Sequence, residues 1–285
     1  MLDLPSPLDG IRSPLGRLRG GTRYLLDQLS TPAAVAYSSR RLSASATLAN
    51  RVRRSSDNAE NNFGFWGGNL DTASLLAHCA GGNGFLTTVY DQSGNGRNFT
   101  QITALNQPSI VTAGVVNTQN GRPLINFDGA GDVLHSATGV ANTIMAGRAF
   151  TAIHVTFSSS GGFGVSGNNA DGVGTSPRAY LQRAGFSYNT LSVVVVPTAS
   201  GGQITSYGHD GVNTAIAWKN GALVGTGTQA VLAAFGGTGT LAVPLTPTTN
   251  AGSLGELLIF SSALSDADRL LVERDMGNYY GIAVA

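Results

Sequence analysis

The segment from Tyr90 to Asn98 constrains the fold of this chain more than any other part of its sequence. A strand-like run that starts at Phe85 ends in Asp-Gln-Ser-Gly-Asn-Gly, and a second run starts at Asn98. Asp91 and Ser93 can bond nearby backbone amides, and the two glycines supply the positive φ angles of a tight turn. The segment therefore predicts a corner between two strands of an all-β fold.

The composition agrees with this prediction. The chain has 285 residues, of which 39 are glycine and only 12 % are charged. It is too apolar for a disordered chain and too rich in glycine for a helical one. Short apolar runs between turn residues predict strands at 85–90, 97–102, 123–127, 149–157, 191–196, 203–207, 213–219, 239–243 and 254–260.

A few helices and one hairpin are also expected. Helices are predicted at 22–29, from Pro32 to Arg41, and at 72–78 behind an N-cap at Asp71. A last helix is predicted from Ser265, with Leu270, Leu271 and Met276 covering a sheet. Asn220-Gly221 predicts a two-residue β-hairpin.

Residues 1–30 are predicted to be an extended docking arm with a short helix, in front of a β-sandwich domain at 31–285. Three prolines block regular structure, and residues 1–54 carry a net charge of +6 against −5 for the remainder. The arginines are interrupted by apolar residues, which does not favour nucleic acid as the partner. The residues expected to make the docking contact with another protein are Leu8, Ile11, Arg12, Leu15, Arg17 and Arg19.

Cys79 is the single cysteine, so no internal disulfide is expected. The N-terminus lacks the basic and apolar regions of a signal peptide. No apolar run approaches the roughly 18–20 residues of a membrane helix. A soluble, unsecreted protein without membrane insertion is therefore predicted.

Four blocks in chain order resemble the concanavalin-like, or laminin-G-like, jelly roll. The stretch 31–101 is also similar to the opening of the catalytic domain of fungal α-L-arabinofuranosidase B. The resemblance implies an antiparallel jelly-roll β-sandwich closed by a C-terminal helix. The four blocks are the 85–98 corner, 120–129 with its Phe-Asp-Gly end, 219–224 with its Asn-Gly turn, and 255–282.

The arabinofuranosidase resemblance also implies where catalytic carboxylates should stand. The nucleophile of that family is a Glu on the strand after a Gly/Asn-rich loop, and Arg178 falls at that place here. Its acid/base Asp lies in a loop before the last strand, and the matching stretch 247–252 has no acid. Cys79 matches one cysteine of a family disulfide, but Gly84 stands here at the position of the partner cysteine. The resemblance therefore implies the scaffold without its catalytic residues.

Other chemistry has little support in the sequence. Glu256 is expected to pair with a buried donor such as an arginine, and Glu273 to be a solvated charge. Arg53, Arg54, Asp57 and Glu60 are expected to form an ion-pair cluster, although a new catalytic pair was the alternative. The histidines show no triad pattern. Asp128, Asp132 and Asp171 are interpreted as turn residues rather than calcium ligands, so no metal or cofactor is expected.

Sugar binding remains as a candidate activity, since it needs exposed aromatic rings beside polar groups. The alternative is that these aromatic residues belong to the core. The candidate glycan-binding residues lie in or beside Gly-rich segments and are Trp66, Tyr180, Tyr188, His209 and Asp210.

The functional hypothesis rests on the arm, the unsecreted N-terminus, the fold and the missing catalytic acids. Its segment 8–16 resembles the start of tailed-phage virion proteins. The sequence-based expectation is therefore a structural virion protein, a capsid decoration, spike or tail component, that is not an enzyme. It would be a homo-oligomer, with a trimer favoured, assembled in the host cytoplasm, docked on other virion proteins and presenting a surface for host glycans. The alternatives are a glycoside hydrolase of arabinofuranosidase type and a free-standing lectin.

Overall fold

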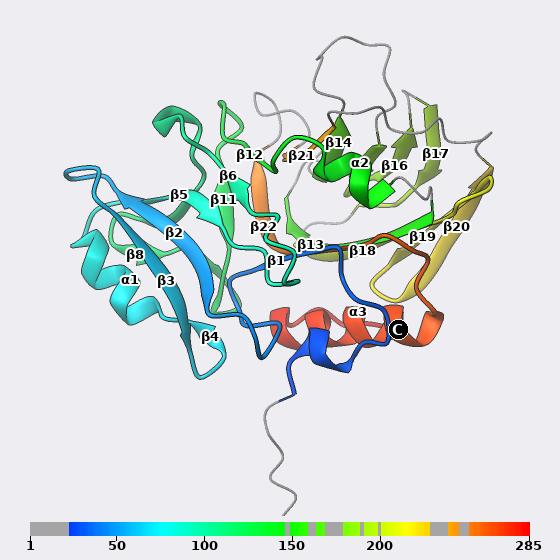
Figure 1. Cartoon of the computed structure of the whole chain (residues 1–285), viewed down its shortest axis with the longest axis horizontal. Coiled ribbons are helices and arrows are strands. Elements are labelled where there is room, and N and C mark those ends of the chain that lie inside the picture. The colour runs from blue at the N-terminus through cyan, green and yellow to red at the C-terminus, as the bar shows by residue number, and fades with distance from the viewer. Residues whose placement is uncertain are drawn as a thin grey trace, which may run out of the picture.

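The computed structural model describes residues 23–145, 149–158, 164–168, 179–188, 191–198, 201–228, 239–244 and 251–285. These residues form two antiparallel β-sheet layers with few helices (Figure 1). The expected antiparallel jelly-roll sandwich is thereby confirmed. The expected docking residues of the arm lie in residues 1–22, outside the described residues. No described helix is both long and apolar enough to cross a membrane.

The first layer is built around β22 (Gly252–Phe260) and β13 (Ala149–Phe157), which pair with each other. On one side β22 also pairs with β1 (Val35–Ser38). On the other side β13 pairs with β18 (Gly202–Asp210), and β19 (Thr214–Lys219) and β20 (Ala222–Thr228) follow in order. The Asn220-Gly221 hairpin between the last two strands is confirmed, since both residues have positive φ.

The second layer runs across ten strands, each antiparallel to the next. Two further strands, β7 (Ser109–Thr112) and β11 (Ile125–Phe127), join β5 to β22 and so connect the layers. The order across the second layer is β3 (Glu60–Trp66), β2 (Leu48–Arg54), β5 (Gly84–Val89), β6 (Phe99–Thr100), β12 (Leu134–His135), β21 (Thr240–Val243), β14 (Gly164–Asn168), β15 (Ala179–Gln182), β16 (Gly185–Tyr188) and β17 (Leu191–Val195).

The first layer is covered on both of its faces, which explains why β13 is buried along its length. Phe150 and Ala152 face the core between the two layers, together with Val52 and Leu86 of the second layer. Ile153, in contrast, belongs to a separate apolar cluster under the C-terminal helix. The second layer therefore has one face in the core and one face toward solvent.

The C-terminal helix α3 (Asp266–Tyr280) covers the outer face of the first layer (Figure 1). Its start at the Ser265 N-cap is confirmed, because the Ser265 hydroxyl accepts a hydrogen bond from the Asp268 amide at 3.1 Å. Met276 packs on the sheet as expected, but its partners there are Val272 and Tyr280 rather than the two leucines.

The corner after β5 forms as predicted and ties the two layers together. The Asp91 carboxylate accepts hydrogen bonds from the amides of Ser93, Arg97 and Ala36, the last of which lies in β1. Gly94 and Gly96 have φ angles of 88° and 69°. The turn chemistry thus fixes one strand of each layer.

The other local predictions had mixed outcomes. Each predicted strand range contains a strand. Helix α1 (Thr72–Cys79) begins behind Asp71, which accepts a hydrogen bond from Ser74 N at 3.1 Å, as predicted. The helix predicted from Pro32 to Arg41 was wrong, because this segment contains β1. The remaining elements are η1 (Leu25–Gln28), β4 (Asn69–Leu70), η2 (Ala104–Asn106), β8 (Val115–Val116), β9 (Thr118–Gln119), β10 (Arg122–Pro123) and α2 (Val140–Met145).

Candidate functional site

A row of paired positions crosses the second layer, and its part from β3 to β12 lies on the solvent face. Directly paired residues of antiparallel strands place their side chains on the same face, and Arg51, Thr100 and His135 in this row are exposed. At the backbone level the row continues through β21 into β14 and β15. The paired positions, in order, are Asn62, Arg51, Thr88, Thr100, His135, Ala242, Ser166 and Tyr180.

A groove of about 250 Å³ lies on this face between β3, β2, β5 and β6. Glu60 and Arg51 form an ion pair across it, with 2.6 Å between Oε2 and Nε. The Thr87 hydroxyl also donates to Glu60, at 3.3 Å. Ile102, which is 94 % exposed, forms an apolar wall. Polar groups beside an apolar wall are what a single sugar ring needs.

Two glutamines make the floor of this groove rigid. The side chain of Gln107 accepts from Arg53 Nε at 2.7 Å and donates to the carbonyl of Gln101 at 3.0 Å. Gln101 in turn donates to the carbonyl of Val133 at 2.8 Å, next to β12. The groove and the His135 end of the row are thus held by one hydrogen-bonded framework.

His135 is open to solvent, yet the surrounding protein lowers its pKa below the ordinary value through desolvation. Its imidazole is therefore neutral at neutral pH. A neutral imidazole in the middle of a polar face can accept a proton from a bound water or hydroxyl group.

A pair of carboxyl groups lies in the loop between β11 and β12. Asp132 is buried, with 6 % of its surface exposed, and accepts a hydrogen bond from the Asp128 amide at 3.0 Å. Burial raises the pKa of Asp132 to about 6; the hydrogen bond from the Asp128 amide opposes this shift, and the Asp128 side chain adds to it. A Cβ at Gly129 would lie 2.9 Å from the amide of Ala251, so this loop packs against the start of β22. One protonated and one ionised carboxyl group together can act as acid and base.

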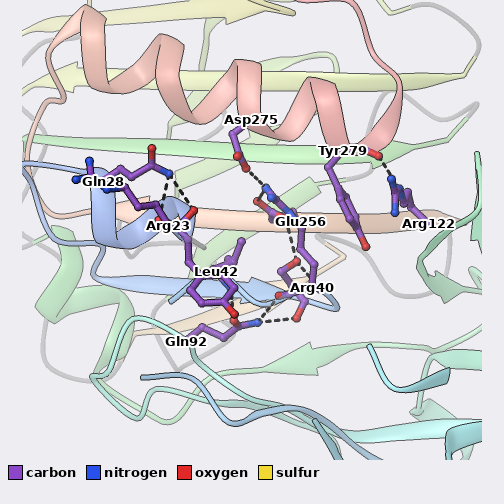
Figure 2. Close-up of polar contacts among 11 residues, drawn as sticks. Arg23, Gln28, Arg40, Leu42, Gln92, Arg122, Glu256, Asp275 and Tyr279 are labelled. Carbon is purple, nitrogen blue, oxygen red and sulfur yellow. Dashed lines mark hydrogen bonds and ion pairs between the residues drawn. The ribbon is translucent and has the colours of Figure 1, made fainter. Parts of the chain in front are cut away.

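A buried ionic network lies on the other side of the molecule, between β1, β22 and α3 (Figure 2). Glu256 has no exposed surface and accepts hydrogen bonds from Arg40 Nε and Nη2 at 2.9 and 3.0 Å. Asp275 forms a second ion pair with Arg40. Ser38 completes the shell around Glu256 at 2.9 Å. The network confirms that Glu256 pairs with a buried arginine, and its saturated contacts fit a structural role.

The other carboxylate predictions differ in outcome. Glu273 is fully buried and bound to Arg269 at 2.7 Å, so the prediction of a solvated charge was wrong. In the predicted cluster, Arg54 pairs with Asp57 at 2.6 Å, while Glu60 pairs with Arg51 rather than with a cluster member.

Three predicted glycan-binding residues have described side chains. Trp66 is 81 % exposed at the end of β3. His209 is 1 % exposed and stacks on Phe150, so it has almost no surface to offer a ligand. Asp210 accepts hydrogen bonds from three consecutive backbone amides after β18, which lowers its pKa to about 2 and fits a turn-forming role.

The other predicted residues are only partly described. Tyr180 pairs with Ser166 and Ser187 in β15, and Tyr188 ends β16. Neither residue has a described side chain. Arg178, Asp171 and the stretch 245–250 lie outside the described residues. Within the described part of the chain, no group of three or more His, Cys, Asp or Glu side chains is placed to hold a metal ion.

The sequence reading missed the row on the second layer and its groove. The signal was available in the alternation of Leu-Ala-Asn-Arg-Val-Arg-Arg at 48–54, which buries Val52 and exposes Arg51. It was missed because arginine and asparagine are poor strand formers on average.

Comparison with known proteins identifies relatives of this fold. A family model described as the catalytic domain of α-L-arabinofuranosidase B matches residues 25–179, more than half of the chain. No curated protein sequence matches it.

Two solved structures show the same fold. A GH54 α-L-arabinofuranosidase soaked with a cyclic sulfate inhibitor is 18 % identical, with a TM-score of 0.63 over 86 % of this chain and 62 % of that chain. An arabinofuranosidase complexed with arabinofuranosyl-α-1,2-xylobiose is 17 % identical, with a TM-score of 0.64 over 88 % and 64 %. The chain thus spans less than two thirds of the length of these structures.

These findings contradict the functional hypothesis drawn from the arm. The matching family model describes a glycoside hydrolase domain, the catalytic domain of α-L-arabinofuranosidase B, and the two solved structures above share its fold. The expectation of a tailed-phage virion protein that is not an enzyme was therefore wrong. The error arose because the absence of acids at the two family positions and a nine-residue resemblance in the arm were together given more weight than the resemblance over 31–101.

Proposed function

Because this chain belongs to the family of α-L-arabinofuranosidase B catalytic domains, we propose that it is a glycoside hydrolase that releases α-L-arabinofuranosyl groups from arabinose-containing saccharides. The observation that carries the proposal is the family match over residues 25–179. The fold shared with two solved arabinofuranosidases supports it.

The solvent face of the second layer is the place where the saccharide would bind. Its groove of about 250 Å³ is smaller than the roughly 300–1,000 Å³ of drug-sized ligand pockets, which suits one sugar unit. At the backbone level the row continues to Tyr180 in β15. Arg178, which the resemblance puts at the position of the family nucleophile, directly precedes that strand in the sequence.

Glycoside hydrolysis generally needs a proton donor and a second group that attacks or activates water. By resemblance, the family positions of both carboxylates are without acids here, at Arg178 and at 247–252. We assign the donor role to Asp128 and Asp132 as a pair. Burial keeps a proton on Asp132 up to a pH of about 6, and Asp128 is the exposed member of the pair. His135, neutral at pH 7, can accept the proton of the attacking water.

The first test is hydrolysis of 4-nitrophenyl α-L-arabinofuranoside by the full chain between pH 4 and 8. We expect release of nitrophenol that falls as the pH rises above about 6, because Asp132 then loses its proton. If correctly folded protein releases no nitrophenol above the buffer rate at any pH, the proposed function is refuted.

Variants then test the assignment of the acids. Asp128→Asn is expected to lower kcat by roughly 10²–10⁴-fold, while Asp71→Asn, a change at the N-cap of α1, should leave it unaltered. Arg178→Glu restores the family residue and should increase the rate. Full activity of Asp128→Asn would show that the Asp128–Asp132 pair is not the proton donor. It would not contradict the proposed hydrolytic activity.

A further inference from the structure

A second cavity, of about 530 Å³, lies between α1, the β9–β10 hairpin, the turn after β7 and the end of α3. It shares no lining residue with the groove on the second layer. Leu70, Leu76 and Val116 give it an apolar wall, while Asn69 and Thr72 supply polar groups. The cavity can therefore contact both kinds of surface that a sugar presents, its apolar ring face and its hydroxyl groups.

Arg122 gives this cavity a positive charge that no carboxylate of the described residues pairs with. Its Nε donates to the carbonyl of Tyr279 at 3.0 Å, and its guanidinium lies 4.4 Å from the Tyr279 ring centroid. Among the described residues Arg122 forms no ion pair, and no Asp or Glu lines the cavity. The neighbouring Arg40, in contrast, is paired with two carboxylates. Figure 2 shows Tyr279 between these two arginines.

An adjoining cavity of about 200 Å³ extends the positive region. Tyr279 and Asn69 line both cavities. Arg41 lines the smaller one, where it stacks 4.8 Å from the Tyr24 ring centroid and donates to backbone carbonyls instead of a carboxylate. Among the described lining residues of the smaller cavity, Asp275 is the one acid, and it is already bound to Arg40. Both cavities together therefore favour an anionic ligand.

Trp66 stands beside these cavities with 81 % of its surface exposed. It is directly paired with Asn69 across the two-residue turn at Gly67 and Gly68, whose φ angles are 57° and 83°. Directly paired residues share a face of the hairpin. The indole is thus held next to a residue that lines both cavities, where it can stack on a sugar ring.

We propose that these two cavities form an accessory site for an acidic saccharide, a chain that contains hexuronate units. The uronate carboxylate pairs with Arg122, a guanidinium suited to bidentate carboxylate binding. Asn69 and Thr72 bond the hydroxyl groups, and Trp66 stacks on a neighbouring unit. The site binds without cleaving, so it does not depend on the proposed hydrolytic activity. It would hold the enzyme on an acidic polysaccharide.

The test is titration of the full chain with tri-galacturonate by calorimetry, with xylotriose as the neutral comparison. We expect saturable binding of tri-galacturonate that weakens as salt is added, because a charge pair contributes to it, and at least tenfold weaker binding of xylotriose. No saturable binding of tri-galacturonate, or equal binding of both, would overturn the proposal.

Variants locate the site. Arg122→Gln should weaken tri-galacturonate binding at least tenfold, and Trp66→Ala should weaken it severalfold. Arg274→Gln, which removes an exposed arginine from α3, is the matched control and should bind as the parent does. Parent-like affinity in both Arg122→Gln and Trp66→Ala would place binding elsewhere and refute the site. Arg122→Lys keeps the positive charge and replaces Arg122→Gln in this test if Arg122→Gln does not fold. It is expected to keep part of the affinity.

Discussion

At the scale of single residues, Asp132 is held in an environment that favours its neutral form. The side chain is buried and close to Asp128. An acid whose pKa is raised by folding binds a proton more tightly in the folded state than in the unfolded one. The same property that makes it a proton donor therefore makes it a source of instability once it ionises.

Asp132→Asn is predicted to stabilise the protein at pH 7.5. The pKa of Asp132 is about 6 when folded against about 4 when unfolded. The parent therefore loses stability as the pH rises from about 4 to 6, and the variant does not. We expect a gain of about 1–2 kcal/mol at pH 7.5 and none below pH 4, after allowance for solvent screening. Urea unfolding at both pH values measures it.

Asp210→Asn is a control with the opposite expected pH dependence, because three backbone amides lower the pKa of Asp210 to about 2. This variant should lose stability at pH 7.5 and match the parent at the lowest pH. An Asp132→Asn gain that stays the same from pH 4 to pH 7.5 would contradict the titration argument.

Some single residues were predictable from sequence and others were not. The resemblance placed residue 84 opposite Cys79, and a Cβ at Gly84 would lie 2.7 Å from the Cys79 sulfur. Glu256 in an apolar strand predicted a buried partner, since a carboxylate there must be paired. Glu273 was misread because its helix has a weak apolar pattern. Arg269, four residues earlier, was the available signal of an ion pair.

At the scale of elements, prediction succeeded where caps and turns set a boundary. Asp71, Ser265 and the Asn220-Gly221 pair each mark an element in the structure. Prediction failed at β1, because Pro32 followed by alanines suggested the start of a helix there. Pairing with β22 decides that segment, and long-range pairing leaves no local pattern. The row on the second layer was missed for the same reason, because strands far apart in sequence supply its positions.

Gly221→Ala tests how firmly the β19–β20 hairpin is held by the end of the chain. Gly221 has a φ of 86°, and an added Cβ would lie 2.7 Å from Val284 and 2.8 Å from the Ala285 amide. The variant should lose about 2–4 kcal/mol of stability, from backbone strain and displacement of the C-terminus. The midpoint of thermal unfolding measures this loss.

Gly94→Ala is the matched control for that change. Gly94 has nearly the same φ, 88°, but an added Cβ would meet nothing within 4 Å. It should lose only the backbone contribution, about 1 kcal/mol. Equal losses for the two variants would show that the hairpin does not depend on the C-terminal residues.

At the scale of the whole molecule, the fold was predictable because four blocks occur in the right order over most of the chain. The candidate site was less so. Its groove depends on Arg51, Glu60 and Gln107, which come from separate strands and a loop and carry no shared motif. The functional prediction failed because the arm, whose expected docking residues lie outside the described residues, and the missing family acids were allowed to outweigh the resemblance of the domain.

The network around Glu256 joins β1 near the start of the domain to β22 and α3 at its end, so it should govern global stability. Glu256→Gln leaves the buried guanidinium of Arg40 with Asp275 alone, and we expect a loss of about 3 kcal/mol. Asp57→Asn, in an exposed pair, should lower the unfolding midpoint far less than Glu256→Gln does. In urea, Glu256→Gln should lower the midpoint while the m-value stays unchanged, because both ends of the chain unfold together. A lower m-value would instead mean that β1 and α3 detach before the sandwich unfolds. The network would then stabilise only the packing of β1 and α3 on the sandwich.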